Sequence, residues 1–162
     1  MSTGPINEFM QRDHRRLEEL LDAADCGATI EFQPYHAFRA GLLRHIGMEE
    51  KILLPAAQRA RGAEPLPEKR QLRLDHAALA ALLVPTPTPS IVAKLREVLA
   101  AHNAIEEGPD GVYAVCEKLI GSDAAALLER LERAPPVSLA PYQDGLRGME
   151  SIRNCLRAAG RE

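Results

Sequence analysis

The stretch RHIGMEEKILLP, residues 44–55, decides how the rest of the chain is interpreted. It contains His45 and Glu49, which are four residues apart and therefore lie one turn apart on the same face of a helix. Leu42 and Leu53 belong to that face, so the pair sits in an apolar stripe. Burying an imidazole and a carboxylate is unfavourable unless something pairs with them. A metal ion bound by both side chains would remove that penalty.

Length and composition restrict the class of protein. A chain of 162 residues favours one compact domain. Hydrophobic residues make up 46% of it and aromatic residues only 4%, so we expect a core of Ala and Leu, which favours helices over sheets. A formal net charge of −3 predicts no broad basic surface for nucleic acid or acidic lipid. No apolar stretch is long enough for a membrane span, and the first residues do not follow a signal-peptide pattern.

The cysteines do not suggest a structural role. Cys26, Cys116 and Cys155 are far apart, and none belongs to a Cys-x-x-Cys pair. We therefore expect neither a disulfide framework nor a thiolate zinc site, and we expect a cytoplasmic location. Cys116 is interpreted as a small buried apolar residue.

Apolar residues recur with helical period along most of the chain, which predicts an all-α fold. The expected helices cover about residues 6–24, 33–61 and 68–84, followed by one that begins at Ser90 as its N-cap and a helical segment at 112–119. Pro55 predicts a kink or an early end in the second helix. We expect an up-down-up-down four-helix bundle over residues 1–121.

Residues 122–162 are expected to form additional helices that pack on the bundle or mediate dimerisation. The last of these helices is expected to have an apolar side, made of Tyr142, Leu146, Met149, Ile152 and Leu156.

Four of the five histidines occupy apolar-face positions, one in each helix of the expected bundle: His14, His45, His76 and His102. Two of them have a glutamate one turn later, Glu49 and Glu106. The intervals between the histidines are similar, so an up-down bundle would bring them to similar depth. Six ligands exceed what one tetrahedral zinc needs. Imidazole and carboxylate without thiolate suit iron or manganese, with zinc possible, and two metals bridged by both carboxylates would use the whole set.

Simpler interpretations and other kinds of metal site compete with this one. A single histidine is more often a core residue bonded to the backbone, and His45–Glu49 alone could be an ordinary intrahelical pair. His36 lies nine residues before His45, on the opposite face, and is expected at the surface. The Glu-x-x-His motifs of ferritin-like sites and the HExxH motif of zinc proteases are absent.

Together these motifs resemble the hemerythrin-like domains, also called HHE cation-binding domains, over about residues 6–120. The matching motifs are Asp13-His14, His45-x-x-x-Glu49 ahead of Leu53-Leu54-Pro55, Asp75-His76 and His102-x-x-x-Glu106. The resemblance implies a di-iron centre with an oxo or hydroxo bridge. It assigns His14 and His45 to one iron, His76 and His102 to the other, and Glu49 and Glu106 to both.

The sequence departs from the oxygen-carrying members of that family at two points. Those members have a His-x-x-x-His pair in the third helix, whereas neither residue one turn from His76 is a ligand here. They also place the last carboxylate five residues after its histidine, so Glu107 is an alternative to Glu106 as the bridge. The second iron therefore has one imidazole fewer, and is either open to small ligands or completed by Glu107 or Asp110.

Two neighbouring residues have open roles. Asp13 could orient a histidine ligand, but a solvated acid on the helix surface is the stronger expectation. Tyr113 is expected to pack in the core, with a place in the metal pocket as the alternative.

The leading functional hypothesis is a cytoplasmic di-iron protein that binds or senses oxygen, peroxide or nitric oxide, and is not a dedicated oxygen carrier. The alternatives are a metal-dependent enzyme that consumes peroxide or repairs iron centres, and a metal-free helical interaction module with residues 122–162 as its partner surface. We expect a diatomic or peroxide ligand and no nucleic-acid or membrane partner, and a homodimer stays open.

Overall fold

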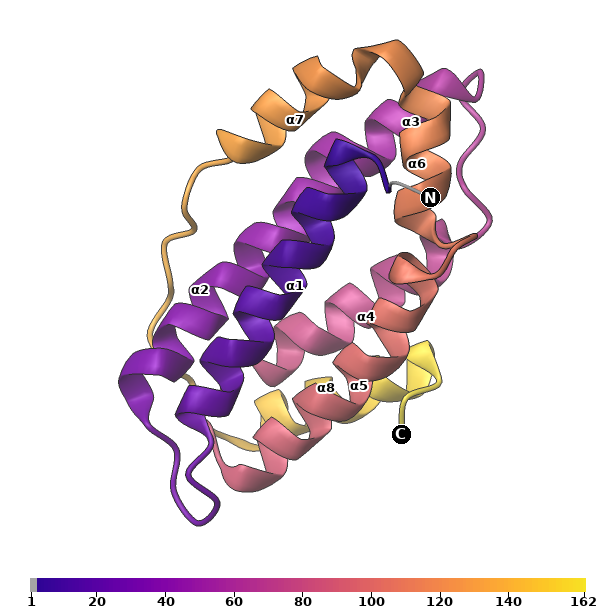
Figure 1. Cartoon of the computed structure of the whole chain (residues 1–162). Coiled ribbons are helices and arrows are strands. Elements are labelled where there is room, and N and C mark those ends of the chain that lie inside the picture. The colour runs from indigo at the N-terminus through magenta and orange to yellow at the C-terminus, as the bar shows by residue number, and fades with distance from the viewer. Residues whose placement is uncertain (1–2) are drawn as a thin grey trace.

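A computed structural model describes residues 3–162, and within these residues the protein is built from helices without any strand (Figure 1). The prediction of an all-α fold is confirmed. The elements are α1 (Pro5–Ala24), α2 (Phe32–Met48), the π-helical turn η1 (Glu49–Leu53), α3 (Leu54–Ala60), α4 (Lys69–Leu82), α5 (Pro89–Glu107), α6 (Val112–Ile120), the 3-10 turn η2 (Gly121–Asp123), α7 (Ala124–Glu132) and α8 (Leu146–Ala159).

The histidine-bearing helices pack against one another in pairs. Helix α1 packs along α2, α4 packs along α5, and α1 also contacts α5. Helix α6 follows α5 after a short break and packs against α1, α3 and α5, where it covers one end of these helices (Figure 1). The four helices that carry the predicted ligands are therefore in continuous contact.

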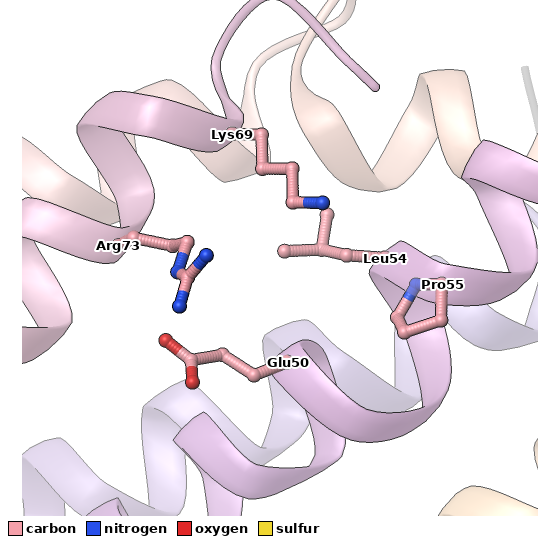
Figure 2. A pocket seen from close by; sticks show the side chains of 5 residues that line it. All are labelled: Glu50, Leu54, Pro55, Lys69 and Arg73. Carbon is pink, nitrogen blue, oxygen red and sulfur yellow. The ribbon is translucent and has the colours of Figure 1, made fainter. Parts of the chain in front are cut away.

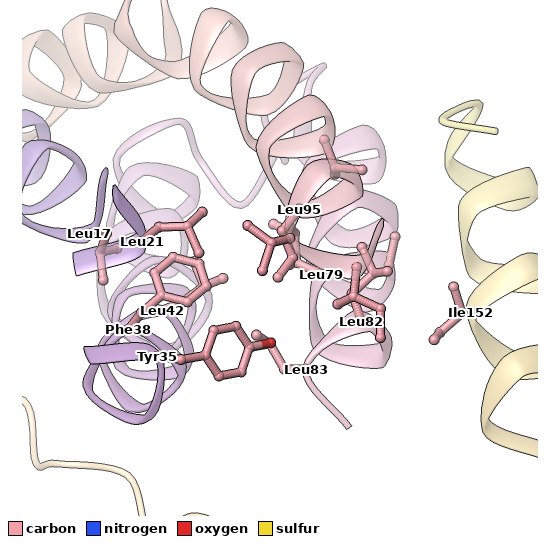
Figure 3. Packing of buried hydrophobic residues seen from close by; sticks show 14 of the residues in the cluster. Leu17, Leu21, Tyr35, Phe38, Leu42, Leu79, Leu82, Leu83, Leu95 and Ile152 are labelled. Atoms are coloured by element: carbon pink, nitrogen blue, oxygen red, sulfur yellow. The ribbon is translucent and has the colours of Figure 1, made fainter. Parts of the chain in front are cut away.

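Two apolar clusters form the interior. Cluster A includes Leu17, Leu21, Phe38, Leu42, Leu79 and Leu95, all of which are labelled in Figure 3. Cluster B includes Met10, Met48, Leu53, Leu72 and Cys116. Along α1, Met10 belongs to cluster B and Leu17 to cluster A, with His14 between them. Each fully buried Leu or Phe contributes about 1.5–3 kcal/mol, so the clusters offset the cost of burying a polar layer between them.

The second predicted helix is nearly continuous from Phe32 to Ala60, but it changes type in the middle. Pro55 has no N–H to donate to the helix. In the turn before it, the Leu54 N–H donates to the Glu49 carbonyl, five residues back, which makes η1 a π turn. Pro55 was expected to cause either a kink or an early end of the second helix. The early end does not occur, because the helix continues as α3 to Ala60. Single π turns are frequent at functional sites, and this one contains Glu49.

Two details of the sequence prediction are wrong. The N-cap of α5 is Thr88 and not Ser90: its Oγ1 accepts from the Ile91 N–H at 3.2 Å, and Pro89 fills the first helical position, where no N–H is needed. The predicted apolar side of the last helix is also too long. Leu146 is 87% exposed and Met149 47% exposed, because only the later turns of α8 face α4.

The C-terminal helices contact the rest of the molecule at two places. Helix α7 packs against α1 and η1, and α8 packs against α4, with Ile152 and Leu156 in cluster A. A role in dimerisation stays a prediction. Within residues 3–162, no helix has both the length and the apolar character needed to cross a membrane.

Candidate metal centre

The six side chains predicted as ligands are all buried, with exposed fractions between 1% and 4%. They form two groups that share both glutamates. The first group contains His14, His45, Glu49 and Glu106, and the second contains Glu49, His76, His102 and Glu106. In each group the candidate ligand atoms lie within 4.8 Å of one another. Each group could therefore hold a metal ion.

Each glutamate presents one oxygen to each group. Glu49 Oε1 lies 3.2 Å from His45 Nε2, and its Oε2 lies 2.9 Å from His76 Nε2. Glu106 repeats the pattern: its Oε2 lies 3.3 Å from His14 Nε2, and its Oε1 lies 3.0 Å from His102 Nε2. Two metal ions bridged by carboxylates require this arrangement.

Each imidazole is also held from outside by a carboxylate at its Nδ1. The pairs are His45 with Asp13 at 2.8 Å, His102 with Asp75 at 3.2 Å, His14 with Glu107 at 2.5 Å and His76 with Glu50 at 2.9 Å. An Nδ1–H that donates to a carboxylate fixes the tautomer and leaves the Nε2 lone pair free for a metal. All four Nε2 atoms point inward, so the rings are oriented as ligands.

The outer carboxylates reveal an internal repeat. Residues 13–50 and residues 75–107 both read Asp-His, then His-x-x-x-Glu-Glu. In both halves the aspartate bonds the second histidine of its own half. The final glutamate of each half, Glu50 or Glu107, bonds the first histidine of the other half. The two halves therefore interlock around the centre.

The structure corrects the expectation for Asp13 and bears on the alternatives left open for Glu107 and Asp110. Asp13 is not a solvated acid, because it is only 9% exposed and accepts from His45 and Arg16. Glu107 lies outside the first group, where it pairs with His14 and Arg15. It therefore does not complete the second group, and neither does Asp110, which is exposed. Glu106 is the inward carboxylate.

The expectations for His36 and Cys116 are confirmed. His36 is exposed, on the face of α2 away from the centre. Cys116 is fully buried, and none of the three cysteines forms a disulfide within the described chain.

Tyr113, for which core packing was expected and a place in the metal pocket was the alternative, lies at the centre of the site. Its hydroxyl oxygen lies 2.5 Å from Glu49 Oε1 and 3.0 Å from Glu106 Oε2. It also lies 3.1 Å from the Nε2 atoms of His14 and His45. The tyrosine is fully buried, and every one of these contacts is to the first group.

The turn between α5 and α6 allows Tyr113 to reach the centre. The Gly111 N–H donates to the Gly108 carbonyl at 2.8 Å, in the short turn that separates the end of α5, with Glu106, from the start of α6. A Cβ on Gly111 would lie 2.5 Å from the Glu106 carbonyl oxygen, so only glycine fits this turn. The Gly-Pro-Asp-Gly segment was the one sequence signal that could have placed Tyr113 in the site.

Negative charge dominates the electrostatics of the site. Burial alone would lower the pKa of His45, but Glu49 and then Asp13 outweigh it and raise that pKa to about 10. Burial would also lower the pKa of His102, but Glu106 and then Asp75 outweigh it and raise that pKa to about 10. Burial and the two glutamates raise the pKa of Tyr113 well above its usual value. The interior therefore requires positive charge, which imidazolium protons or metal ions can supply.

The second group contains buried polar atoms without a satisfactory partner. Among the described residues, Glu49 Oε2, Glu106 Oε1 and His76 Nε2 make no hydrogen bond of proper geometry, although each lies near another ligand atom. A buried polar atom left unsatisfied costs about 1–3 kcal/mol. All three atoms belong to the second group, whose candidate ligand atoms lie within 4.8 Å of one another, so an ion bound there could satisfy them together.

Glu50 links the second group to the surface. Its carboxylate contacts His76 Nδ1, while its side chain is 36% exposed. Figure 2 shows Glu50 and Arg73 facing each other across a surface cavity of about 170 Å³, with Leu54 and Pro55 in its wall. Arg73 also contributes to a lowered pKa of Glu50, after the larger effect of the bond to His76.

Comparisons with protein-family models, with curated proteins and with solved structures find no match. The hemerythrin resemblance therefore rests on the motifs alone. To these motifs the structure adds buried histidine and glutamate groups that could hold metal ions within an all-helical protein.

Proposed function

We propose that this chain is a hemerythrin-like four-helix-bundle protein with a di-iron centre that binds or senses a small molecule such as oxygen, peroxide or nitric oxide. One observation carries the proposal: Glu49 and Glu106 each present one oxygen to each histidine pair. In this assignment His14 and His45 would hold one ion, His76 and His102 would hold the other, and the two glutamates would be shared.

The donor set fits iron. Imidazole nitrogens and carboxylate oxygens without thiolate suit iron or manganese, and also permit zinc. The carboxylates on Nδ1 supply the outer support that metal-binding histidines usually have. Iron bound here would provide one-electron redox chemistry and coordination positions for a small ligand.

The chain itself provides orientation, charge and exclusion of water. Clusters A and B enclose the polar layer on two sides, and the ligand side chains are at most 4% exposed. The outer carboxylates hold the rings with Nε2 facing the two glutamates. Neither group has a third imidazole, so an ion in either one would keep positions for a small ligand. This favours sensing or redox chemistry over reversible oxygen carriage.

Metal analysis and optical spectroscopy of the protein purified from iron-supplemented cells test the proposal. We expect about two irons per chain, a visible spectrum that changes when nitric oxide is added to the reduced protein, and a melting temperature that rises on iron loading. His76→Ala should bind less than two irons per chain, whereas the surface variant His36→Ala should match the wild type. A protein that binds no iron, and whose melting temperature does not change on iron addition, would refute the proposal and favour a metal-free interaction module.

A further inference from the structure

The two halves of the centre differ at one position of consequence. Each half supplies an Asp-His pair, a second histidine and a Glu-Glu pair, in the same order. Seven residues after Glu106 the chain has Tyr113, whereas seven residues after Glu49 it has Ala56. The phenol therefore has no counterpart in the first half of the repeat. All of its polar contacts are made to the first group.

We propose that Tyr113 is a metal ligand of the first group alone, so that the two ions of the centre have different coordination. This inference rests on the proposed function, because it requires that the centre binds metal. It goes beyond that function because it identifies an additional ligand and assigns it to one ion of the two.

The contacts of the phenol exceed what a hydroxyl can satisfy. A tyrosine hydroxyl donates one hydrogen bond and has two lone pairs. Here four polar atoms lie within 3.1 Å of it, two imidazole nitrogens and two carboxylate oxygens. One proton cannot satisfy both Glu49 and Glu106. A cation shared by the phenol oxygen, the imidazoles and the carboxylates would satisfy all of them.

The position of the phenol is fixed by the chain around it. Tyr113 is fully buried, and its neighbours Val112 and Cys116 pack in cluster B. The Gly108–Gly111 turn leaves no room for a side chain at Gly111. The ring therefore has little freedom to leave the first group. When an ion binds, the phenol O–H bond breaks, an oxygen–metal bond forms and the proton passes to the buffer, while no electron is transferred.

The consequence is an unequal pair of ions. The first would have two imidazoles, the two shared carboxylates and the phenolate as protein donors. The second would have two imidazoles and the same two carboxylates. An added small molecule should therefore bind at the ion held by His76 and His102.

The visible spectrum of the iron(III)-loaded protein tests this inference, because a phenolate bound to iron(III) gives an intense charge-transfer band that imidazoles and carboxylates do not give. We expect this band in the wild type. It should be lost in Tyr113→Phe while at least one iron per chain remains. The matched control is Tyr35→Phe, which removes another fully buried hydroxyl, one that belongs to cluster A. The control should retain the band.

A second measurement does not depend on the folding of the variant. The chain has three tyrosines, and resonance Raman spectra of the wild type made with ring-deuterated tyrosine should show shifted phenolate vibrations. A protein with about two irons per chain and no such vibrations would overturn the role of Tyr113 and leave the di-iron proposal intact. A protein that binds no iron would overturn both. If the phenol moved aside when metal binds, the protein would contain about two irons per chain and show no phenolate vibrations, which would overturn the role of Tyr113.

Discussion

Replacing Arg161 should weaken metal binding in the second group and leave the first group unchanged. Arg161 follows α8 near the C-terminus, and its guanidinium donates to both oxygens of Asp75, at 3.0 Å and 3.1 Å. Asp75 is completely buried and contacts His102 Nδ1 at 3.2 Å. In the first group the equivalent aspartate, Asp13, is paired with Arg16 of its own helix. The C-terminal segment therefore supports only one of the two groups.

The expected loss of metal affinity follows from the position of Arg161, which contacts Asp75, which in turn contacts the ligand His102. Loss of a residue that orients a metal ligand typically reduces metal affinity 10–100-fold, which is about 1.4–2.7 kcal/mol. Gln71 also donates to Asp75, at 3.0 Å, and stays in place in the variant. We therefore expect Arg161→Gln to reduce the metal affinity of the second group about tenfold, near the lower end of that range.

Titration with cobalt(II) against a competing chelator would measure the two binding steps separately. The control is Arg157→Gln, because Arg157 lies four residues earlier, in α8, but pairs with the exposed Glu162. We expect the second step alone to weaken in Arg161→Gln, and neither step to change in the control. Equal weakening of both steps, or no change in either, would show that the outer carboxylates do not act on the two groups separately.

Three further predictions concern the pH dependence of the metal-free protein, the shared ligand Glu49 and the helix cap at Thr88. The pKa values of His45 and His102 are raised from an ordinary 6.5 to about 10, so their protonation stabilises the metal-free fold fully below about pH 6.5 and less as the pH rises towards 10. Urea unfolding of the metal-free protein should therefore give a free energy of unfolding at least about 1 kcal/mol lower at pH 9 than at pH 6. Metal affinity should change in the opposite direction and increase with pH, because the ligands must lose their protons to bind a metal ion. Glu49→Gln should reduce bound metal below two ions per chain, by metal analysis after gel filtration, while Glu19→Gln on the surface should not. Thr88→Ala should lower the free energy of unfolding by about 1 kcal/mol through loss of the α5 N-cap, without changing the bound metal.

The grouping of the candidate ligands could be predicted because it depends largely on local geometry. A spacing of four residues puts His45 and Glu49 on the same helix face whatever the helix packs against. The same holds for His102 and Glu106, and the structure brings both pairs together. The apolar residues on either side of each histidine were enough to show that these faces point inward.

The remaining parts of the site depend on how separate elements meet. The carboxylate partners of the histidines come from other helices, so no spacing within one helix predicts them. Tyr113 comes from α6, which is separated from Glu106 by the Gly108–Gly111 turn, so its place in the first group depends on that turn. The Glu-Glu pairs at 49–50 and 106–107 did carry a signal, since the first member of each faces inward and the second bonds an outer nitrogen.

Glu50 and Glu107 each bond a histidine of the other half, and these bonds affect how fast a bound metal ion could leave. A chelator in solution cannot reach ligand atoms on side chains that are at most 4% exposed. Release of an ion then requires the helices to separate, which breaks the bond from Glu107 to His14 and the bond from Glu50 to His76. The release rate is therefore set by a local opening of the fold. It should reach a plateau as the chelator concentration increases, and an ion once bound would remain for as long as the helices stay together.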